Sequence, residues 1–258
     1  MNTEYTQTGF VFASTEDGSP TLLQLGEKGE MMHHSGGAAA ETRYIYKSVI
    51  SHCLAESQNM PLKTCVVGLG LGYIEMSWAM EARTCCPGPD LSRLNPSDIS
   101  LVSYEVDQGL IDSFQSWVFG TANETSNSYI YDQIFQSLNV AVPIEEVKNI
   151  LAQNFTSFPV KGDFSVEYEK DNSLNLICFD AFSQQTSQKL WSLDFLTRFL
   201  AESAHPDCVL TTYACTGRLK KALRDNGFEV IQRPAFRGYR DSTLALRGRF
   251  KSLKNKIG

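Results

Sequence analysis

Gly68, Gly70 and Gly72 follow the apolar stretch CVV, and their close spacing suits the binding of a small molecule. A buried strand that runs into glycines lets the backbone turn sharply and approach a ligand at the start of the next helix. The same pattern also occurs in dinucleotide-binding enzymes and at tight turns that bind nothing. A second observation must therefore decide what this loop holds.

Glu105 supplies such an observation, because it ends the apolar stretch ISLVSYE. An acid at this point can accept hydrogen bonds from both ribose hydroxyls of an adenosine. A nicotinamide enzyme would use the same acid, but the glycine loop lacks the longer spacing to a third glycine that is typical of those enzymes. Asp163, in the stretch KGD, is a candidate for reaching the adenine amino group, and its alternative role is that of a turn residue.

Asp180 ends another apolar stretch, LNLICFD, and Phe182 follows two residues later. Ligands of open α/β sheets bind outside the carboxyl ends of the strands. A carboxylate there can accept N–H bonds from an amine and take up a released proton. An aromatic ring beside it can stack on a planar base. The alternative is that Asp180 caps a loop and that Phe182 belongs to the core.

The order of strand and helix patterns predicts the fold that would position these residues. Strands alternate with helices through most of the chain, which indicates a parallel sheet covered on both faces. Only AFRGYR separates the last two strands, too few residues for a helical crossover, so they are expected to pair as an antiparallel hairpin. The seven strands are expected in KTCVV, ISLVSYE, FPVKGDFSV, LNLICFD, DCVLTTYA, FEVIQRP and DSTLALRG.

This plan is that of a class I, Rossmann-like methyltransferase, an α/β fold with a mostly parallel seven-stranded sheet and a terminal antiparallel hairpin. Residues 61–258 are expected to form this domain. Residues 1–60 are expected to form an N-terminal extension packed on it, with a hairpin at 9–25 and a helix at 41–56.

Composition excludes several classes of protein. The chain has 258 residues, of which 42% are hydrophobic and 20% charged, as in ordinary globular proteins. No run of 18 apolar residues is present to span a membrane. The seven cysteines form no Cys-x-x-Cys pair, which favours reduced thiols and a cytoplasmic location. The four histidines show no metal-ligand spacing, so no metal site is expected.

Charge is distributed unevenly along the chain. The net charge is −6, but residues 216–258 carry 12 lysines and arginines against 3 acids. A basic end on an acidic body can be a docking surface for a polyanion, and the alternative is an ordinary solvated surface. Arg237 and Arg240, between the last two predicted strands, are the candidates closest to a substrate entrance. Other basic candidates are Arg218, Lys220, Lys221, Arg224 and Arg233.

Several stretches taken together resemble a known family, the methyltransferase domain of MnmC and its single-domain relatives. These stretches are DGSPTL, HSGGAAAETRYIY, GLGLG, SYE, KGD, FDAFS with LW following, TTYACTGRLKKAL with GFEV, and YRDSTLA, and they are distributed over most of the chain, from residue 17 to residue 245. The resemblance implies S-adenosylmethionine as cofactor and tRNA as partner. It also implies that 5-aminomethyluridine at the wobble position is converted to its 5-methylaminomethyl form.

By the same resemblance, each matching residue acquires an expected role. Gly68, Gly70, Gly72, Glu105 and Asp163 would hold the cofactor, and Glu41 and Thr42 would lie near it. Asp180 would be the catalytic acid–base residue. The flavin oxidase domain fused to some relatives is not expected in this chain, which continues for about 80 residues after Asp180.

Two departures from the family pattern keep other functions open. Val66 stands where relatives usually have an acid, and the loop after Asp180 reads SQQTSQ instead of carrying prolines. One alternative is a transferase of the same fold that acts on a small-molecule or protein amine, including aminopropyl transfer. The other is a non-catalytic protein that binds the cofactor or tRNA. Salt dependence and detection of methyl transfer distinguish these alternatives.

Overall fold

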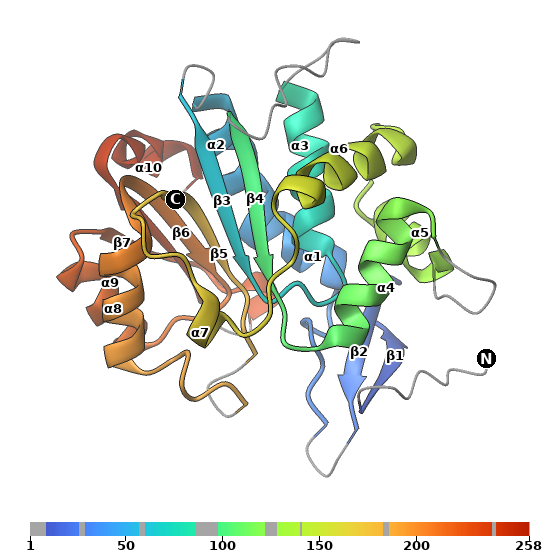
Figure 1. The fold of residues 1–258 in the computed structure, drawn as a ribbon. Helices are drawn as coiled ribbons and strands as arrows, with labels where there is room; N and C mark the ends of the chain where they lie inside the picture. The colour runs from blue at the N-terminus through green and yellow to red at the C-terminus, as the bar shows by residue number, and fades with distance from the viewer. Residues whose placement is uncertain are drawn as a thin grey trace.

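A six-stranded sheet forms the centre of the described part of the chain (Figure 1). The computed structural model describes residues 9–25, 29–56, 60–85, 98–121, 128–139, 141–182, 186–238 and 241–257. The strands lie in the order β4 (Ile99–Tyr104), β3 (Leu62–Val67), β5 (Leu174–Phe179), β6 (Ala204–Thr212), β8 (Ser242–Arg247) and β7 (Glu229–Arg233). The first four are parallel, and β8 runs antiparallel to both of its neighbours. The predicted sheet type and terminal hairpin are therefore confirmed.

The strand count differs from the prediction at residues 158–166. This segment makes one parallel bridge, between Lys161 and Tyr104, and then enters the short helix α7 (Phe164–Glu167). Pro159 has no N–H to donate to a ladder, and Asp163 caps α7 through its side chain. The segment therefore leaves the sheet edge after a single bridge, and six strands remain in the described residues instead of seven.

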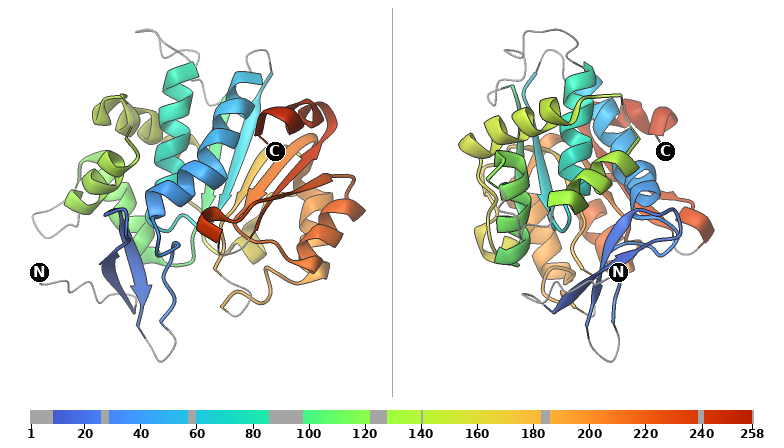
Figure 2. Two further views of the ribbon diagram at one scale, coloured as in Figure 1. Left: turned by 180° about the vertical axis from the view of Figure 1, so that it is seen from behind. Right: turned by 90° about the vertical axis from the view of Figure 1, so that its right-hand side faces the viewer.

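Helices cover both faces of the sheet (Figure 2). One face packs against α2 (Ser48–Glu56) and α3 (Tyr73–Cys85), and their buried side chains join one core cluster with η4 (Gly248–Leu253) and α10 (Lys254–Ile257). The other face packs against α8 (Leu193–Ser203) and α9 (Gly217–Asp225). Strands buried on both faces are mostly apolar, as β5 illustrates: all six positions are buried, and of these only Asn175 is polar.

The middle of the chain forms three helices beside α3. They are α4 (Gln108–Phe119), α5 (Ser128–Ser137) and α6 (Ile144–Ser157). Phe114, Trp117 and Tyr131 pack their rings together, with centroids 5.5–5.9 Å apart. This aromatic cluster supports the ligand side of the fold, because Phe114 lies directly behind the glycine loop.

The N-terminal hairpin lies beyond the carboxyl ends of β3 and β4 (Figure 1). It consists of β1 (Phe10–Ser14) and β2 (Pro20–Gln24), and the chain then reaches a helical segment made of α1 (Ala38–Thr42), the π-helix η1 (Arg43–Lys47) and α2. The predicted hairpin and helix are confirmed, although the π-helical turn was not foreseen. Phe10 and Leu22 of the hairpin belong to the same buried cluster as the helices.

At the other end of the chain, α9 has a typical signal at each of its ends. The Thr216 hydroxyl accepts a hydrogen bond from Leu219 N at the start of α9, and Gly227 has a φ of 78° after its end. A short turn, η3 (Phe236–Gly238), follows β7. No described helix is long and apolar enough to cross a membrane.

Candidate active site

A cavity of about 450 Å³ lies at the carboxyl ends of β3, β4 and β5. This is the position at which open α/β sheets bind ligands, and the volume suits a cofactor-sized molecule. Among the described lining residues, five side chains carry a carboxyl group, and none is a lysine or arginine. The acids are Glu30, Glu41, Glu105, Asp163 and Asp180.

Two of the three glycines line this cavity. Gly68 has a φ of 95°, and a Cβ there would lie 2.7 Å from the Asp180 main-chain oxygen. Gly70 has a φ of 53°, and its N–H donates to Glu105 Oε2 over 3.0 Å. Gly72 also has positive φ, but a Cβ there would meet the Phe114 ring, and Gly72 does not line the cavity. Its requirement for glycine is therefore set by packing behind the loop.

Glu105 is held by the main chain. Its Oε1 accepts from Val106 N and Asp107 N over 2.9 and 3.0 Å, while Oε2 accepts from Gly70 N. Burial raises the pKa of the Glu105 carboxyl, and these three N–H groups oppose the rise. The carboxylate thus ties the glycine loop to the end of β4, and it retains lone-pair capacity toward the cavity.

Asp163 combines the two roles that its sequence context suggested. Its Oδ1 accepts from Ser165 N over 2.8 Å, which caps α7, so the residue is a turn and capping residue. It also lines the cavity. Its contact with an adenine amino group stays a prediction.

Asp180 follows β5 directly, and its main-chain N–H donates to Val67 O over 2.9 Å. Its Oδ1 accepts a 2.5 Å hydrogen bond from the hydroxyl of Tyr46, which is 2% exposed. Burial raises the pKa of the Asp180 carboxyl well above its usual range. The Tyr46 hydrogen bond opposes this rise, and the charge of Glu41 adds to it. The carboxyl is therefore poised to exchange a proton in a way that Glu105 is not.

Glu41 approaches the same cavity from α1. Its Oε2 accepts from His34 N over 2.8 Å, and burial raises the pKa of the Glu41 carboxyl to about 7. Thr42, the neighbour expected beside the cofactor, is 2% exposed, does not line the cavity, and donates its hydroxyl to Ala38 O. Thr42 therefore stabilises the helix, and Glu41 alone of this pair faces the site.

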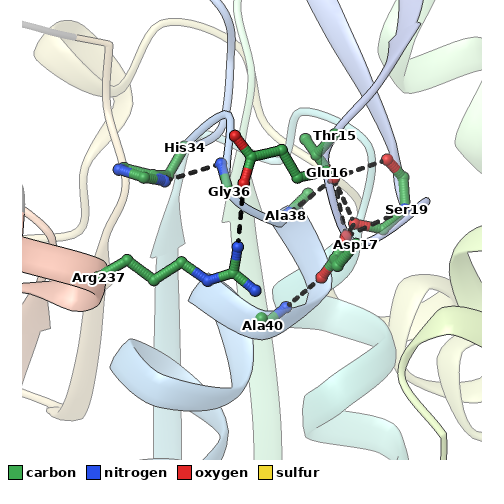
Figure 3. A network of polar contacts seen from close by, with 9 residues as sticks. All are labelled: Thr15, Glu16, Asp17, Ser19, His34, Gly36, Ala38, Ala40 and Arg237. Carbon is green, nitrogen blue, oxygen red and sulfur yellow. Dashed lines mark hydrogen bonds and ion pairs between the residues drawn. The ribbon is translucent and has the colours of Figure 1, made fainter.

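The turn of the N-terminal hairpin anchors the start of α1 (Figure 3). Thr15 Oγ1, Ser19 Oγ and Asp17 Oδ2 accept from the main-chain N–H groups of residues 38, 39 and 40 over 3.1–3.3 Å. Three otherwise unpaired helix donors are satisfied in this way. The hairpin thereby fixes the helix that carries Glu41.

Aromatic rings border the cavity next to Asp180. Phe182 lines it and stacks on Phe10, with ring centroids 5.9 Å apart and planes inclined by 19°. Trp191 Nε1 donates to Phe182 O over 2.6 Å, which holds the main chain of this loop. Phe236 and Tyr213 also line the cavity, although the sequence singled out neither of them.

The basic candidates lie in different surroundings. Arg237 is exposed and pairs with Glu16 Oε2 over 3.2 Å (Figure 3), and its φ of 48° lies in the left-handed region. Lys221 pairs with Asp225 on α9. Arg233 is 4% exposed and hydrogen-bonds to Thr211 and to the main chain of Ile45, so its prediction as a surface contact for a polyanion is wrong. Arg240 lies outside the described residues.

The lining fits a cation that carries an adenosine. A sulfonium and an ammonium are both attracted by a group of carboxylates that no arginine or lysine of the described lining offsets. Burial lowers the pKa of His33 to about 4, so this lining residue stays neutral and does not counter the acids. S-adenosylmethionine carries both of these cations besides a carboxylate, and Gly68, Gly70 and Glu105 are the lining residues that would hold it. The described residues contain no cluster of metal-ligating side chains.

Two buried groups near the cavity escaped the sequence analysis. Tyr46 was hidden because the stretch RYIYK was interpreted as ordinary α-helix. Glu75, in the first turn of α3, is fully buried and accepts from the Ser103 hydroxyl over 2.8 Å. Ser103 is the strand partner of Val66, so a buried carboxyl lies close to the position where the family pattern expects an acid.

Comparison with known proteins agrees with this geometry. A family model described as an S-adenosyl-L-methionine-dependent methyltransferase matches residues 138–248. The bifunctional protein MnmC of Cupriavidus metallidurans, named for tRNA 5-methylaminomethyl-2-thiouridine biosynthesis, is 38% identical over 66 residues, which are 26% of this chain. The aligned part spans only 10% of that relative.

Two solved structures share the fold. MnmC2 from Aquifex aeolicus superposes with a TM-score of 0.62 at 20% identity and covers 93% of this chain and 71% of its own. A spermidine synthase in complex with the transition-state analogue AdoDATO gives a TM-score of 0.51 at 12% identity, with 96% and 72% covered. At these identities the two likenesses establish the fold alone.

The sheet order, the cavity and the family model define the chain as an S-adenosylmethionine-dependent methyltransferase of class I fold. Within that class it is similar to MnmC of Cupriavidus metallidurans over part of its sequence and to MnmC2 of Aquifex aeolicus in fold.

Proposed function

We propose that the protein transfers a methyl group to the primary amine of 5-aminomethyluridine at the wobble position of tRNA. The observation that carries this proposal is the half-buried Asp180, which lies beside the glycine loop in a cavity whose described lining has five carboxyl groups and no lysine or arginine. The curated relative named for tRNA 5-methylaminomethyl-2-thiouridine biosynthesis supports the choice of substrate.

The acceptor amine is the group that this site must prepare. S-adenosylmethionine, when bound, supplies a methyl group on a positively charged sulfur. A primary aminomethyl group is mostly protonated at neutral pH and must lose a proton before its lone pair can attack. Asp180 accepts the N–H bonds of this group and takes its proton. The raised pKa of Asp180 brings the carboxyl closer to that of the amine, so the transfer is less uphill.

Positioning of the two reactants contributes to the rate in addition to proton transfer. Gly68 and Gly70 let the main chain approach one reactant, while Phe182 offers a ring face to the base of the other. Holding two reactants in line removes up to roughly 7–11 kcal/mol from a barrier in favourable cases. The buried Tyr46 covers one side of the Asp180 carboxyl, which receives the proton.

Incubation with labelled S-adenosylmethionine and tRNA that carries 5-aminomethyluridine, followed by nucleoside analysis, tests the proposal. We expect the label in 5-methylaminomethyluridine, and activity that falls as salt rises because basic side chains neutralise phosphates. Putrescine and a lysine-containing peptide serve as competing acceptors. Label in either amine but not in tRNA would overturn the tRNA assignment, and label in none would overturn catalysis.

We also propose that the protein works in the cytoplasm, where tRNA is modified. Cys53, Cys65, Cys178 and Cys208 are buried thiols, as expected for a reducing compartment.

A further inference from the structure

The turn that presents Tyr46 to Asp180 is π-helical. Segment η1 (Arg43–Lys47) lies between α1 and α2 and interrupts the α-helical pattern of hydrogen bonds. Single π-turns inside α-helices are rare and occur frequently at functional sites. Here the wider turn has a visible effect: Tyr46 is buried, and its hydroxyl donates to Asp180 Oδ1.

The main-chain oxygen of Ile45, in the middle of this turn, is bound by side chains from outside the helix. Thr211 Oγ1 donates to it over 2.7 Å, and both terminal nitrogens of Arg233 approach it at 3.3 Å. Arg233 Nη2 also donates to Thr211 Oγ1 over 2.9 Å. Side chains from the carboxyl-terminal parts of β6 and β7 therefore donate hydrogen bonds to a single carbonyl of the π-helical turn.

Placing the Arg233 side chain beside this turn costs desolvation free energy. It is 4% exposed, and no carboxylate of the described residues forms an ion pair with it. Burial lowers the pKa of its guanidinium, and interaction with the side chains of Tyr44 and Tyr46 opposes that change. A buried cation without an acid partner costs several kcal/mol of desolvation. The hydrogen bonds of Arg233 to the Ile45 carbonyl and to Thr211 offset part of this desolvation cost.

We infer that the Thr211–Arg233 pair, acting through the Ile45 carbonyl and the Tyr46 hydroxyl, positions the Asp180 carboxylate for proton uptake. Tyr46 and Arg233 are then positioning residues, since neither lines the cavity. The inference rests on the proposed function for the identity of the proton donor. The placement of the carboxyl itself can be measured without any substrate.

Four groups influence the charge of Asp180. Tyr46 of η1 donates a hydrogen bond that favours the carboxylate, whereas the charge of Glu41 of α1 disfavours it. Glu75 of α3 and Cys178 of β5 also interact with Asp180 electrostatically. Tyr46 is thus the one neighbour of this set whose removal should make Asp180 harder to ionise.

The first test uses the ligand-free protein labelled with carbon-13 at its aspartate carboxyls. Asp180→Asn identifies the Asp180 signal, which is followed as a function of pH by NMR. We expect Tyr46→Phe to move its midpoint upward by about one pH unit, the scale of a lost hydrogen bond to a charged group. Tyr44→Phe is the matched control, because that hydroxyl lies on the same turn but donates to Pro234 O. An unmoved midpoint in Tyr46→Phe overturns the inference.

Arg233→Met tests the outer part of the arrangement, and Thr211→Val serves if that variant does not fold. Either should move the midpoint in the same direction as Tyr46→Phe but by less, and Arg233→Lys should restore part of the difference. If Arg233→Met and Thr211→Val leave the pH midpoint of the Asp180 signal unchanged while Tyr46→Phe shifts it, the positioning role of Thr211 and Arg233 is overturned.

Methyl transfer gives a second readout. In Tyr46→Phe the acidic limb of the kcat/KM profile should move to higher pH by the same amount, with cofactor affinity unchanged. A merely structural role would lower the melting temperature without moving this limb. If Tyr46→Phe shifts the NMR midpoint of Asp180 but the wild-type protein methylates no tRNA, the proposed function is refuted and the positioning role stands. If the wild-type protein methylates tRNA but Tyr46→Phe leaves the acidic limb of the kcat/KM profile unmoved, the positioning role is refuted and the proposed function stands.

Discussion

Glu105 and Asp180 end nearby strands and face one cavity, but the protein holds them in different ways. Glu105 accepts three hydrogen bonds from main-chain N–H groups, whereas Asp180 accepts one from the side chain of Tyr46. Burial raises the pKa of both carboxyls. Hydrogen bonds from the main chain favour the ionised form of Glu105, which suits a residue that binds a ligand. Asp180 has fewer partners and is suited to gain and lose a proton.

The largest effect that this difference predicts is at Asp180. Asp180→Asn keeps an acceptor for Tyr46 but removes the proton-accepting carboxylate, so methyl transfer should fall by about 10²–10⁴-fold. Affinity for S-adenosylmethionine, measured by calorimetry, should stay within a few-fold. Near-normal turnover in this variant would mean that Asp180 is only a capping residue.

The second effect should be found in binding. Glu105→Gln replaces one oxygen with an amide group that cannot accept from Gly70 N, and it removes a charge from the cofactor side. We expect affinity for S-adenosylmethionine to weaken by about 1.5–3 kcal/mol, the range for hydrogen bonds to charged groups. Glu75→Gln is the matched control, since Glu75 is buried behind the same loop without lining the cavity. Equal losses in the two variants would indicate general damage to the loop.

A smaller, directional effect is expected from Glu41. Its negative charge raises the pKa of Asp180, so Glu41→Gln should lower that pKa. The acidic limb of the kcat/KM profile should then move to lower pH by less than about one unit. Tyr46→Phe should move the same limb the opposite way. Shifts in the same direction for both variants would contradict this electrostatic account.

The smallest effect is expected far from the two acids. Arg237→Ala combined with Arg240→Ala should raise the KM for tRNA a few-fold and reduce the salt dependence by up to about 0.9 in log–log slope for each lost phosphate contact. Cofactor affinity should not change. Lys256→Ala is the control, because Lys256 lies on α10 and pairs with Glu56. An unaltered slope with full activity would identify Arg237 as part of a solvated surface.

The sequence predicts the two acids better than it predicts the residues that hold Asp180 in place, namely the π-helical turn and Arg233. Glu105 and Asp180 end apolar stretches, and the parallel arrangement of those strands brings their ends to one edge. Local patterns were enough for this inference. Gly72 and Thr42 were predicted near the cofactor, but neither lines the cavity. A glycine in a loop and a residue in a helix do not reveal from the sequence which side of the loop or helix faces the ligand.

The supports of Asp180 could not have been predicted in the same way. A π-turn differs from an α-helix by one residue, and the stretch RYIYK fits the apolar spacing of either. Arg233 appeared as one more cation in a basic segment, although its burial follows from contacts with residues 188 and 22 positions away. Only the tertiary fold joins those segments.

The acidic lining of the cavity has a consequence for the end of the catalytic cycle. Methyl transfer converts a sulfonium into an uncharged thioether, so the carboxylates lose one of their cationic partners when the reaction occurs. Two unit charges 4 Å apart attract each other by about 4 kcal/mol at an effective dielectric constant of 20. The spent cofactor is therefore held less firmly than the fresh one. Exchange at this site is favoured by charge, and product inhibition should weaken as more of the lining acids are ionised.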